Sequence, residues 1–253
     1  MPYVESVVTF IDILGFGEMV GADSTGEDVL RVVSRFRMYG TEDLDGRRQS
    51  LKGAAIQFSD CIVRCTPLRT GREETIREDV SEEVEDLTYL QGELAAEGIF
   101  LRGGIAIGRA HIDVGGVFGP AMIEAYRLES QHAVHPRIVL HPDIVKRYGS
   151  AGDAGAGVYA DDQVMLTRAA DDGLHFVDYL RNFPREVHTE SSPWRENIAR
   201  SYMVPRKTLI ERELARHPAL SKVRSKYAWL AGYHNDVASD ILGSEATDVL
   251  VAL

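Results

Sequence analysis

The sequence predicts a mixed α/β (α+β) fold with a ferredoxin-like sheet that carries helices on one face, followed by a C-terminal helical extension. Strand-like and amphipathic helical segments alternate through residues 1–150 in the order strand, helix, strand pair, helix, strand, helix, strand. This order is typical of the split βαβ arrangement. From residue 193 onward the patterns are helical. We therefore expect a core domain at residues 1–150, and edge strands and helices packed on it at residues 151–253.

The first predicted strand ends in a single acidic residue. Asp12 follows a run of mostly β-branched or aromatic residues, and the chain then turns through glycines on either side of Phe16. A second apolar stretch carries Asp60 in similar surroundings. An ionised carboxylate among apolar neighbours is costly unless something pairs with it. Asp12 alone is either a metal ligand or part of a capped turn or a structural ion pair. Two such acids together indicate a shared cation, since carboxylate oxygens are typical ligands of Mg²⁺ and Mn²⁺.

The remaining elements follow from hydrophobic periodicity. In the core we expect a helix over 26–39, a charged loop over 41–52, strands around 54–58 and 60–65, a polar surface insertion over 69–81, and a helix over 82–97. We then expect a strand over 99–108, a hairpin over 110–118, a helix over 121–131 and a strand over 137–140. After these come a flexible loop over 150–157, two edge strands within 158–180, and helices over 194–203, 205–216 and 221–242.

Two local features leave alternatives open. Ser59 and Asp60 lie either in a tight turn between two strands or within one bent strand, and we favour the turn. The glycine pair Gly103 and Gly104 either lets another segment approach the backbone closely or forms a bulge.

Composition excludes several classes of protein. The 253 residues contain no long apolar run, and the N-terminus lacks the features of a secretory signal, so we expect a cytoplasmic protein. The formal charge of −11 argues against wrapping duplex nucleic acid, although a small anionic substrate could be received by cations and local arginines. Cys61 and Cys65 lie too far apart along one strand for a disulfide, so we expect reduced thiols.

Other catalytic patterns have weak support. His132, His135 and His141 lack a cysteine spaced to complete a zinc site, and two of them precede prolines in the manner of loops. The sequence has no Gly-x-Ser-x-Gly elbow, and residues 150–157 lack the Gly-Lys-Ser/Thr ending of a phosphate loop. Arg102 is either an exposed edge residue or a contact for a phosphate or base, and Arg127 either pairs with a neighbouring glutamate or acts in catalysis.

Four segments together resemble class III nucleotidyl cyclases. Residues 10–16 (FIDILGF) resemble the Phe-x-Asp-Ile-x-Gly-Phe strand end of that family, and residues 58–60 (FSD) resemble its second metal strand, which usually reads Gly-Asp. Residues 101–108 (LRGGIAIG) are similar to the next, glycine-ended strand. Residues 119–129 (GPAMIEAYRLE) resemble the helix that ordinarily carries Asn-x-x-x-Arg-Leu-Glu. The likeness covers about residues 5–150 in the right order and leaves the C-terminal helices unexplained.

Three departures from the family pattern concern the nucleotide base. Ile56 stands where purine cyclases place a lysine, Ala121 stands at the usual base-selecting position, and Ile123 stands at the transition-state asparagine. A site that selects a purine through hydrogen bonds cannot discriminate when the side chains at those positions are apolar. Asp12, Asp60 and Arg127 are nevertheless retained, so the combination resembles the pyrimidine cyclases of bacterial anti-phage signalling, with UTP as the expected substrate and CTP as the alternative.

The resemblance implies a role for each candidate residue. Asp12, Asp60 and the carbonyl of Ile13 would hold two divalent cations, Mn²⁺ or Mg²⁺, and Arg127, from the partner subunit of a homodimer with shared sites, would stabilise charge on the α-phosphate. Backbone N–H groups from Leu14 to Gly17, including Gly15 and Phe16, would hold the β- and γ-phosphates, and Arg102 and Gln57 would read the base. A separate effector would sense the product.

Two rival interpretations remain. Polymerase palms and diguanylate cyclases also place paired acids on a similar sheet, although residues 58–61 do not match the Gly-Gly-Asp/Glu-Glu-Phe motif of diguanylate cyclases. A degenerate cyclase domain that binds nucleotide without chemistry is the non-enzymatic alternative.

Overall fold

The computed structural model describes residues 3–41, 53–69, 71–113, 116–152, 155–160, 164–187 and 193–252. Its strands are β1 (Val4–Ile13), β2 (Ala54–Phe58), β3 (Cys61–Pro67), β4 (Leu101–Asp113), β5 (Gly116–Phe118), β6 (Ile138–Leu140), β7 (Ser150–Gly152), β8 (Gly155–Gly157), β9 (Thr167–Ala169) and β10 (His175–Val177). Its α-helices are α1 (Phe16–Ala22), α2 (Glu27–Thr41), α4 (Glu73–Ala96), α5 (Pro120–Arg127), α6 (Pro142–Tyr148), α7 (Tyr179–Val187), α8 (Pro193–Arg216) and α9 (Lys222–Leu242). A π-helical turn, η1 (Leu128–His132), continues α5, and a 3₁₀ helix, η2 (Gly243–Asp248), follows α9.

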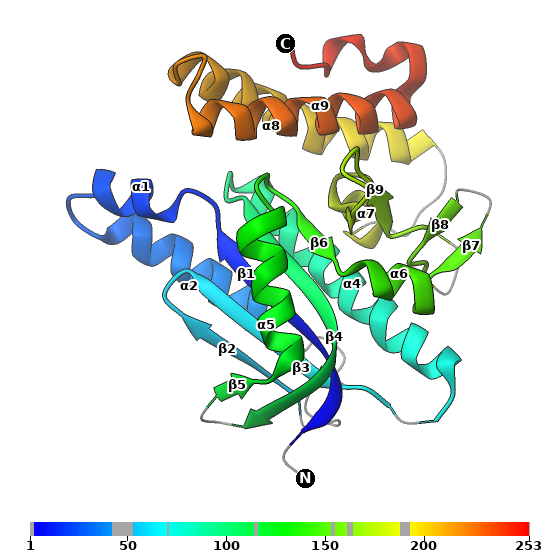
Figure 1. Cartoon of the computed structure of the whole chain (residues 1–253). Coiled ribbons are helices and arrows are strands. Elements are labelled where there is room, and N and C mark those ends of the chain that lie inside the picture. The colour runs from blue at the N-terminus through cyan, green and yellow to red at the C-terminus, as the bar shows by residue number, and fades with distance from the viewer. Residues whose placement is uncertain are drawn as a thin grey trace.

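The predicted fold class is confirmed. One sheet of eight strands has the order β2-β3-β1-β4-β6-β10-β9, with β5 paired to β4 (Figure 1). Within it, β2-β3-β1-β4 is the antiparallel ferredoxin-like arrangement, and β6 adds in parallel to β4. The predicted edge strands within 158–180 are β9 and β10, and β9 forms the outer edge.

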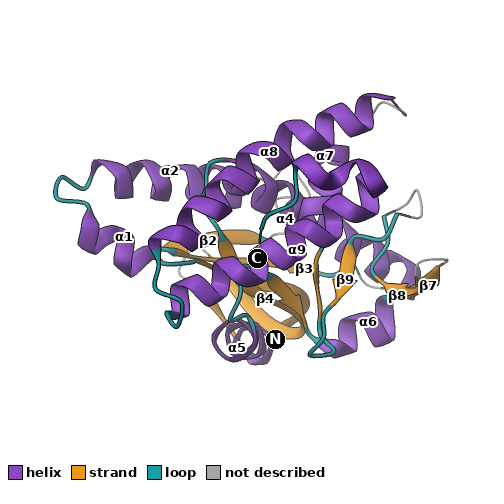
Figure 2. Cartoon of the chain, turned by 90° about the horizontal axis from the view of Figure 1, so that it is seen from above, coloured by secondary structure: helices purple, strands orange, loops and turns teal. Residues whose placement is uncertain are grey.

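Helices cover both faces of this sheet. The crossover helices α2 and α4 lie on one face, as expected, and contribute Phe36, Val84 and Leu87 to the main hydrophobic core. Helix α5 lies on the opposite face, which corrects the expectation of helices on one face only; there Ala121 and Ala125 pack with Val8 in a second, smaller cluster (Figure 2). The even-numbered residues of β1, including Asp12, point to this second face, because side chains alternate along a strand.

The C-terminal helices α8 and α9 run across one end of the sheet, above the end of β1 at which α1 begins (Figure 1). Buried residues of α9, such as Leu230 and Val237, belong to the main core. Among the described helices, none combines the length and the apolar character that a membrane span requires.

Several local predictions are corrected. Residues 73–81 belong to helix α4 rather than a surface insertion, and their Asp79 carboxylate is buried and accepts hydrogen bonds from Arg69. The predicted loop at 150–157 contains the short antiparallel pair β7 and β8. Helix α8 runs without a break through Pro205, where two helices were expected. Helices α1, α6 and α7 were not predicted, and most of the predicted loop over 41–52 lies outside the described residues.

Candidate active site

Asp12 and Asp60 meet because of strand register. Asp12 pairs with Cys61 across β1 and β3, and Cys61 pairs with Phe58 across β3 and β2. Ser59 and Asp60 form the tight turn between β2 and β3, as predicted. Ser59 has a positive φ of 55°, a conformation that hairpin turns of two residues require and that glycine adopts more easily. This turn places Asp60 beside the end of β1.

The two carboxylates lie close enough to share a cation. One oxygen of Asp12, one oxygen of Asp60 and the Sγ atom of Cys61 all lie within 4.8 Å of one another. The Ile13 N–H donates to the backbone carbonyl of Asp60 over 3.1 Å, which ties the turn to the strand end. Asp12 is buried, and Asp60 is partly exposed.

Arg102 is bound to Asp12. Its Nε and Nη2 atoms lie 2.8 and 2.7 Å from Asp12 Oδ2, and Nη2 also lies 2.9 Å from Glu129 Oε1. The predicted base reader is therefore engaged by two acids, and it competes with any cation for Asp12 Oδ2. The other oxygen, Oδ1, accepts the Cys61 thiol over 3.5 Å.

Negative charge exceeds positive charge at this point. Burial raises the pKa of Asp12; Arg102 opposes the shift, and Asp60 adds to it. Burial likewise raises the pKa of Glu129, against Arg102 and reinforced by Asp12 and Asp60. Two carboxylates thus contact one guanidinium, and the carboxylate of Asp60 lies beside Asp12 without an ion pair to a described Lys or Arg.

Glu129 reaches the site because α5 and η1 pack directly on Gly104 of β4. A Cβ atom added to Gly104 would lie 2.4 Å from the carbonyl oxygen of Ala125 and 2.5 Å from Cβ of Leu128. The close-approach interpretation of the glycine pair is thus the one the structure supports. The π-helical turn η1 begins at Leu128 and carries Glu129, and such turns are frequent at functional sites.

The donor set fits a hard divalent cation. Asp12 and Asp60 supply carboxylate oxygens, which suit Mg²⁺ or Mn²⁺. Burial and the same two acids raise the pKa of Cys61 to about 12, so its thiol stays protonated and is a poor ligand. A cation at this point would relieve the excess of carboxylate charge.

Gly15 and Phe16 follow the strand end directly. Gly15 adopts a positive φ of 81°, and a Cβ atom added there would meet nothing within 4 Å. Phe16 packs partly against the main core. The Leu14 N–H donates to the Phe100 carbonyl over 2.8 Å and is not available to a ligand, whereas no described residue accepts from the N–H groups of Gly15, Phe16 or Gly17.

Two predicted site residues lie away from Asp12. Gln57 points to the α2 face of the sheet, where its Oε1 accepts from Arg37 Nε over 2.6 Å. Arg127 is exposed on α5, and its Nη1 lies 2.6 Å from Glu124 Oε1. Within a single chain, Arg127 therefore pairs with a neighbouring glutamate, which is the first of the two alternatives that the sequence left open.

Apolar side chains surround the acids on the same face. Register places Ile56 and Phe58 on the face of Asp12, and Phe58 is 82% exposed. Ile123 is 53% exposed on α5, whereas Ala121 is buried between α5 and the sheet. Of the three positions that depart from the purine pattern, Ile56 and Ile123 can meet a ligand or partner.

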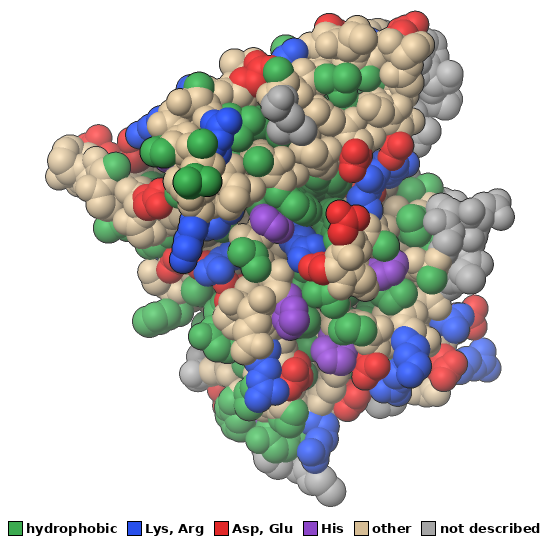
Figure 3. Space-filling model, turned by 45° about the horizontal axis from the view of Figure 1, so that its top comes forward, with side chains coloured by type: hydrophobic (Ala, Val, Ile, Leu, Met, Phe, Trp, Pro, Cys, Tyr) green, Lys and Arg blue, Asp and Glu red, His purple; other side chains and the backbone are tan. Residues whose placement is uncertain are grey.

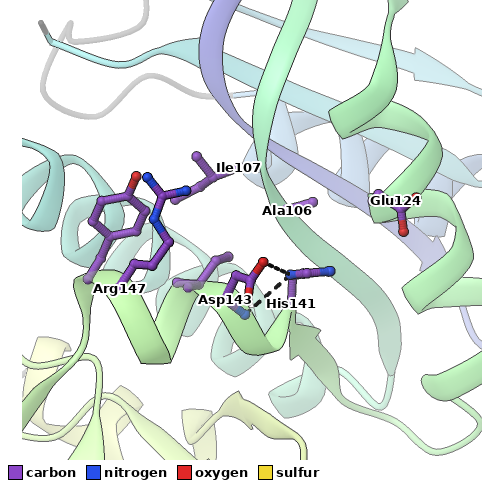
Figure 4. A pocket seen from close by; sticks show the side chains of 8 residues that line it. Ala106, Ile107, Glu124, His141, Asp143 and Arg147 are labelled. Carbon is purple, nitrogen blue, oxygen red and sulfur yellow. Dashed lines mark hydrogen bonds and ion pairs between the residues drawn. The ribbon is translucent and has the colours of Figure 1, made fainter.

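A small cavity of about 90 Å³ lies beside α5 and α6, lined by residues that include Glu124, His141 and Arg147 (Figure 4). The backbone N–H of Asp143 donates to Nδ1 of His141 here over 3.3 Å. Nucleotide-sized ligands occupy pockets of roughly 300–1,000 Å³, so this cavity is too small for one.

Sequence reasoning missed three residues near the site. The sequence indicates Glu129 only as part of a motif and Cys61 only as a reduced thiol, and it gives no site signal for Lys226 of α9. The only available signal was the Arg-Leu-Glu ending of residues 127–129.

Comparisons with known proteins place solved cyclases among the similar structures. No protein-family model matches the chain, and no curated protein matches it. The guanylyl cyclase Cya2 is 16% identical, with a TM-score of 0.43 over 69% of this chain and 91% of its own. A class III adenylyl cyclase-like ATP-binding protein from Pseudomonas aeruginosa is 17% identical, with a TM-score of 0.41 over 62% of this chain and 38% of its own.

An adenylate/guanylate cyclase/hydrolase from Silicibacter pomeroyi is 20% identical, with a TM-score of 0.37 over 57% of this chain and 79% of its own. All three identities lie below 25% and all three TM-scores below 0.5. The three similar structures are a guanylyl cyclase, a cyclase-like ATP-binding protein and an adenylate/guanylate cyclase/hydrolase.

Proposed function

We propose that this chain is a nucleotidyl cyclase that converts UTP to 3′,5′-cyclic UMP and pyrophosphate. The observation that carries the proposal is the meeting of Asp12 and Asp60 at the end of β1, within 4.8 Å and with an excess of negative charge. Two carboxylates brought together by a strand end and a turn can hold cations of the kind that stabilise the attacking and leaving oxygens of an in-line displacement.

Asp12, Asp60 and the carbonyl of Ile13 would hold Mn²⁺ or Mg²⁺. When bound, the cations lower the pKa of the ribose 3′-hydroxyl and neutralise the triphosphate. The 3′-oxygen then forms a bond to the α-phosphorus, the bond from that phosphorus to the bridging oxygen breaks, and pyrophosphate leaves. The hydroxyl proton passes to solvent, so the chain needs no separate general base. The open N–H groups of Gly15 and Phe16 are suited to bind the phosphate oxygens.

Arg102 would change partners when a cation binds. Its contact to Glu129 can persist, while Asp12 Oδ2 is released to the cation. The freed guanidinium lies on the same face as Phe58 and Ile56 and is our candidate for reading the base. We leave Gln57 out of this role because it points to the other face.

Arg127 would act in a second copy of the chain. Its exposed position on α5 suits a contribution across an interface, where it would stabilise charge on the α-phosphate. The exposed aromatic residues Phe58 and Tyr126 lie on the same side of the sheet, which favours a homodimer there. Its two sites would then be shared.

The choice of a pyrimidine rests on Ile56 and Ala121, which stand at the lysine and base-selecting positions of purine cyclases and cannot hydrogen bond a purine edge. CTP is the alternative substrate. The product would serve as a second messenger, sensed by a separate effector in anti-phage defence.

The test is incubation of the chain with each of the four ribonucleoside triphosphates and Mn²⁺, followed by chromatography of the products. Cyclic UMP should dominate, and Asp60→Ala should abolish it while the circular dichroism spectrum is unchanged. A linear dinucleotide, or turnover of ATP alone, would refute the proposal.

One observation favours a second candidate, a nucleotide-binding module without catalysis. Arg102 already neutralises Asp12, as expected if no cation binds there. In that case the chain binds nucleotide, releases no pyrophosphate, and Asp60→Ala leaves the binding unchanged.

A further inference from the structure

A larger cavity lies between the core sheet and the C-terminal helices. Its volume is about 290 Å³, and its walls come from the strand end at Ile13–Gly15, from α1, from the end of α8 and from the first turns of α9. In the space-filling view, basic, histidine and acidic side chains lie along the boundary below the upper helices (Figure 3). The cavity thus begins at the residues that directly follow Asp12.

Cations exceed anions on these walls. Arg212, Arg216 and Lys226 face two carboxylates, Glu18 and Glu213, among the described lining residues. Glu213 is buried and already lies 3.0 Å from Arg212 Nη2 and 3.9 Å from Arg216 Nη1. The carboxylate of Glu213 is therefore engaged by α8 itself.

Lys226 has no such partner. It is partly buried on α9, and its ammonium forms no ion pair and no hydrogen bond with another described residue. Lys222, one turn earlier on the same helix, is exposed and does not line the cavity. A partly buried ammonium without a carboxylate partner is costly unless a ligand supplies the negative charge.

Lys226 also lies within electrostatic reach of the acidic site. Burial lowers the pKa of its ammonium, the charge of Arg102 lowers it further, and Glu18 and Asp12 act in the opposite direction. The cavity and the carboxylate pair are therefore neighbouring parts of one region, contributed by segments more than 200 residues apart in sequence.

We propose that this cavity receives the β- and γ-phosphates of the bound nucleoside triphosphate, with Lys226 as their binding residue. The inference rests on the proposed function for the identity of the ligand, and it assigns the C-terminal helices a role in substrate binding. Phosphate oxygens would give Lys226 the charge-assisted hydrogen bonds that the free chain lacks.

The first test uses inorganic tripolyphosphate, which has the phosphate chain and no reactive hydroxyl. Its dissociation constant is measured by calorimetry in the presence of Mg²⁺ for the wild type, Lys226→Gln and Lys222→Gln. We expect Lys226→Gln to weaken binding about tenfold or more, the usual range for a lost charge-assisted contact. Lys222→Gln should bind as the wild type does, and Lys226→Arg should restore most of the affinity.

Equal binding by Lys226→Gln and Lys222→Gln, or no binding by the wild type, would overturn the inference. Steady-state kinetics then separates substrate from free polyphosphate: Lys226→Gln should raise KM for the triphosphate with little change in kcat. Weaker tripolyphosphate binding with an unchanged KM would also overturn it, since the cavity would then hold a different anion.

The two proposals fail in different ways. If the wild type forms no cyclic product but binds tripolyphosphate through Lys226, the cyclase proposal fails while the cavity remains a triphosphate site. If cyclic product forms and Lys226→Gln changes neither binding nor KM, the cavity inference fails alone.

Discussion

Replacing Arg102 with glutamine should destabilise the chain and strengthen its response to Mn²⁺. Arg102 makes two contacts to Asp12 Oδ2, at 2.8 and 2.7 Å, and one to Glu129 Oε1 at 2.9 Å. A unit charge pair at 4 Å is worth about 4 kcal/mol at an effective dielectric constant of 20. The Arg102 side chain is 31% exposed, so solvent screening reduces this figure. We expect a loss of about 2 kcal/mol in the free energy of unfolding at neutral pH.

The pH dependence of this loss has a defined sign. Asp12 and Glu129 both have raised pKa values, and removing Arg102 raises them further, because Arg102 favours their charged forms. A carboxyl group whose pKa is raised in the folded state destabilises the fold once it is deprotonated. The loss in the free energy of unfolding caused by Arg102→Gln should therefore grow as pH rises and vanish at acidic pH.

The assay is urea unfolding of the wild type and Arg102→Gln in EDTA and in saturating Mn²⁺. Mn²⁺ should stabilise the variant more than the wild type, because the cation replaces the missing charge without having to displace the guanidinium. Arg109→Gln, at an exposed position on the same strand, is the control and should respond to Mn²⁺ as the wild type does. Equal Mn²⁺ stabilisation of all three proteins would refute the view that Arg102 and a cation share Asp12.

Three further predictions concern folding and the geometry of the site. Burial lowers the pKa of His234 to about 4, and its Nε2 lies 2.9 Å from the carbonyl oxygen of Val249. The neutral form of this histidine therefore contributes stability above pH 6.5, and this contribution is lost as the pH falls towards 4. In the wild type the free energy of unfolding in urea should fall by about 2 kcal/mol more between pH 7.5 and pH 5 than it does in His234→Asn. Gly92→Ala should lower stability by about 2 kcal/mol in thermal and urea unfolding, because the added Cβ would lie 2.0 Å from the Phe183 ring; an unchanged midpoint would contradict this packing. Gly104→Ala should reduce cyclase activity at least tenfold while far-ultraviolet circular dichroism is retained, because the methyl group displaces α5 from β4; full activity would show that this contact does not position the site.

The carboxylate pair could be predicted because both acids stand out locally. Asp12 lies near the end of an apolar strand and Asp60 lies in the turn between two others, and a ferredoxin-like order makes β1 and β3 neighbours. Hydrophobic periodicity and strand order are therefore enough to predict that Asp12 and Asp60 lie close together.

The partners of these acids could not be predicted in the same way. Whether Arg102 reaches Glu129 depends on how closely α5 approaches Gly104, which is a property of packing and not of sequence spacing. Lys226 lies far along the chain and is brought near Asp12 only by the docking of α9 on the core. Pro205 was expected to end a helix, yet α8 continues through it.

The most direct test of the central claim is a Mn²⁺ titration followed by electron paramagnetic resonance of the free ion. The wild type should bind Mn²⁺, and Asp60→Asn, which keeps the shape of the side chain, should bind it at least tenfold more weakly. Asp28→Asn, at an exposed acid of α2, should match the wild type. If Asp60→Asn binds Mn²⁺ as tightly as the wild type does, Asp12 and Asp60 do not hold a shared cation and the cyclase mechanism is contradicted.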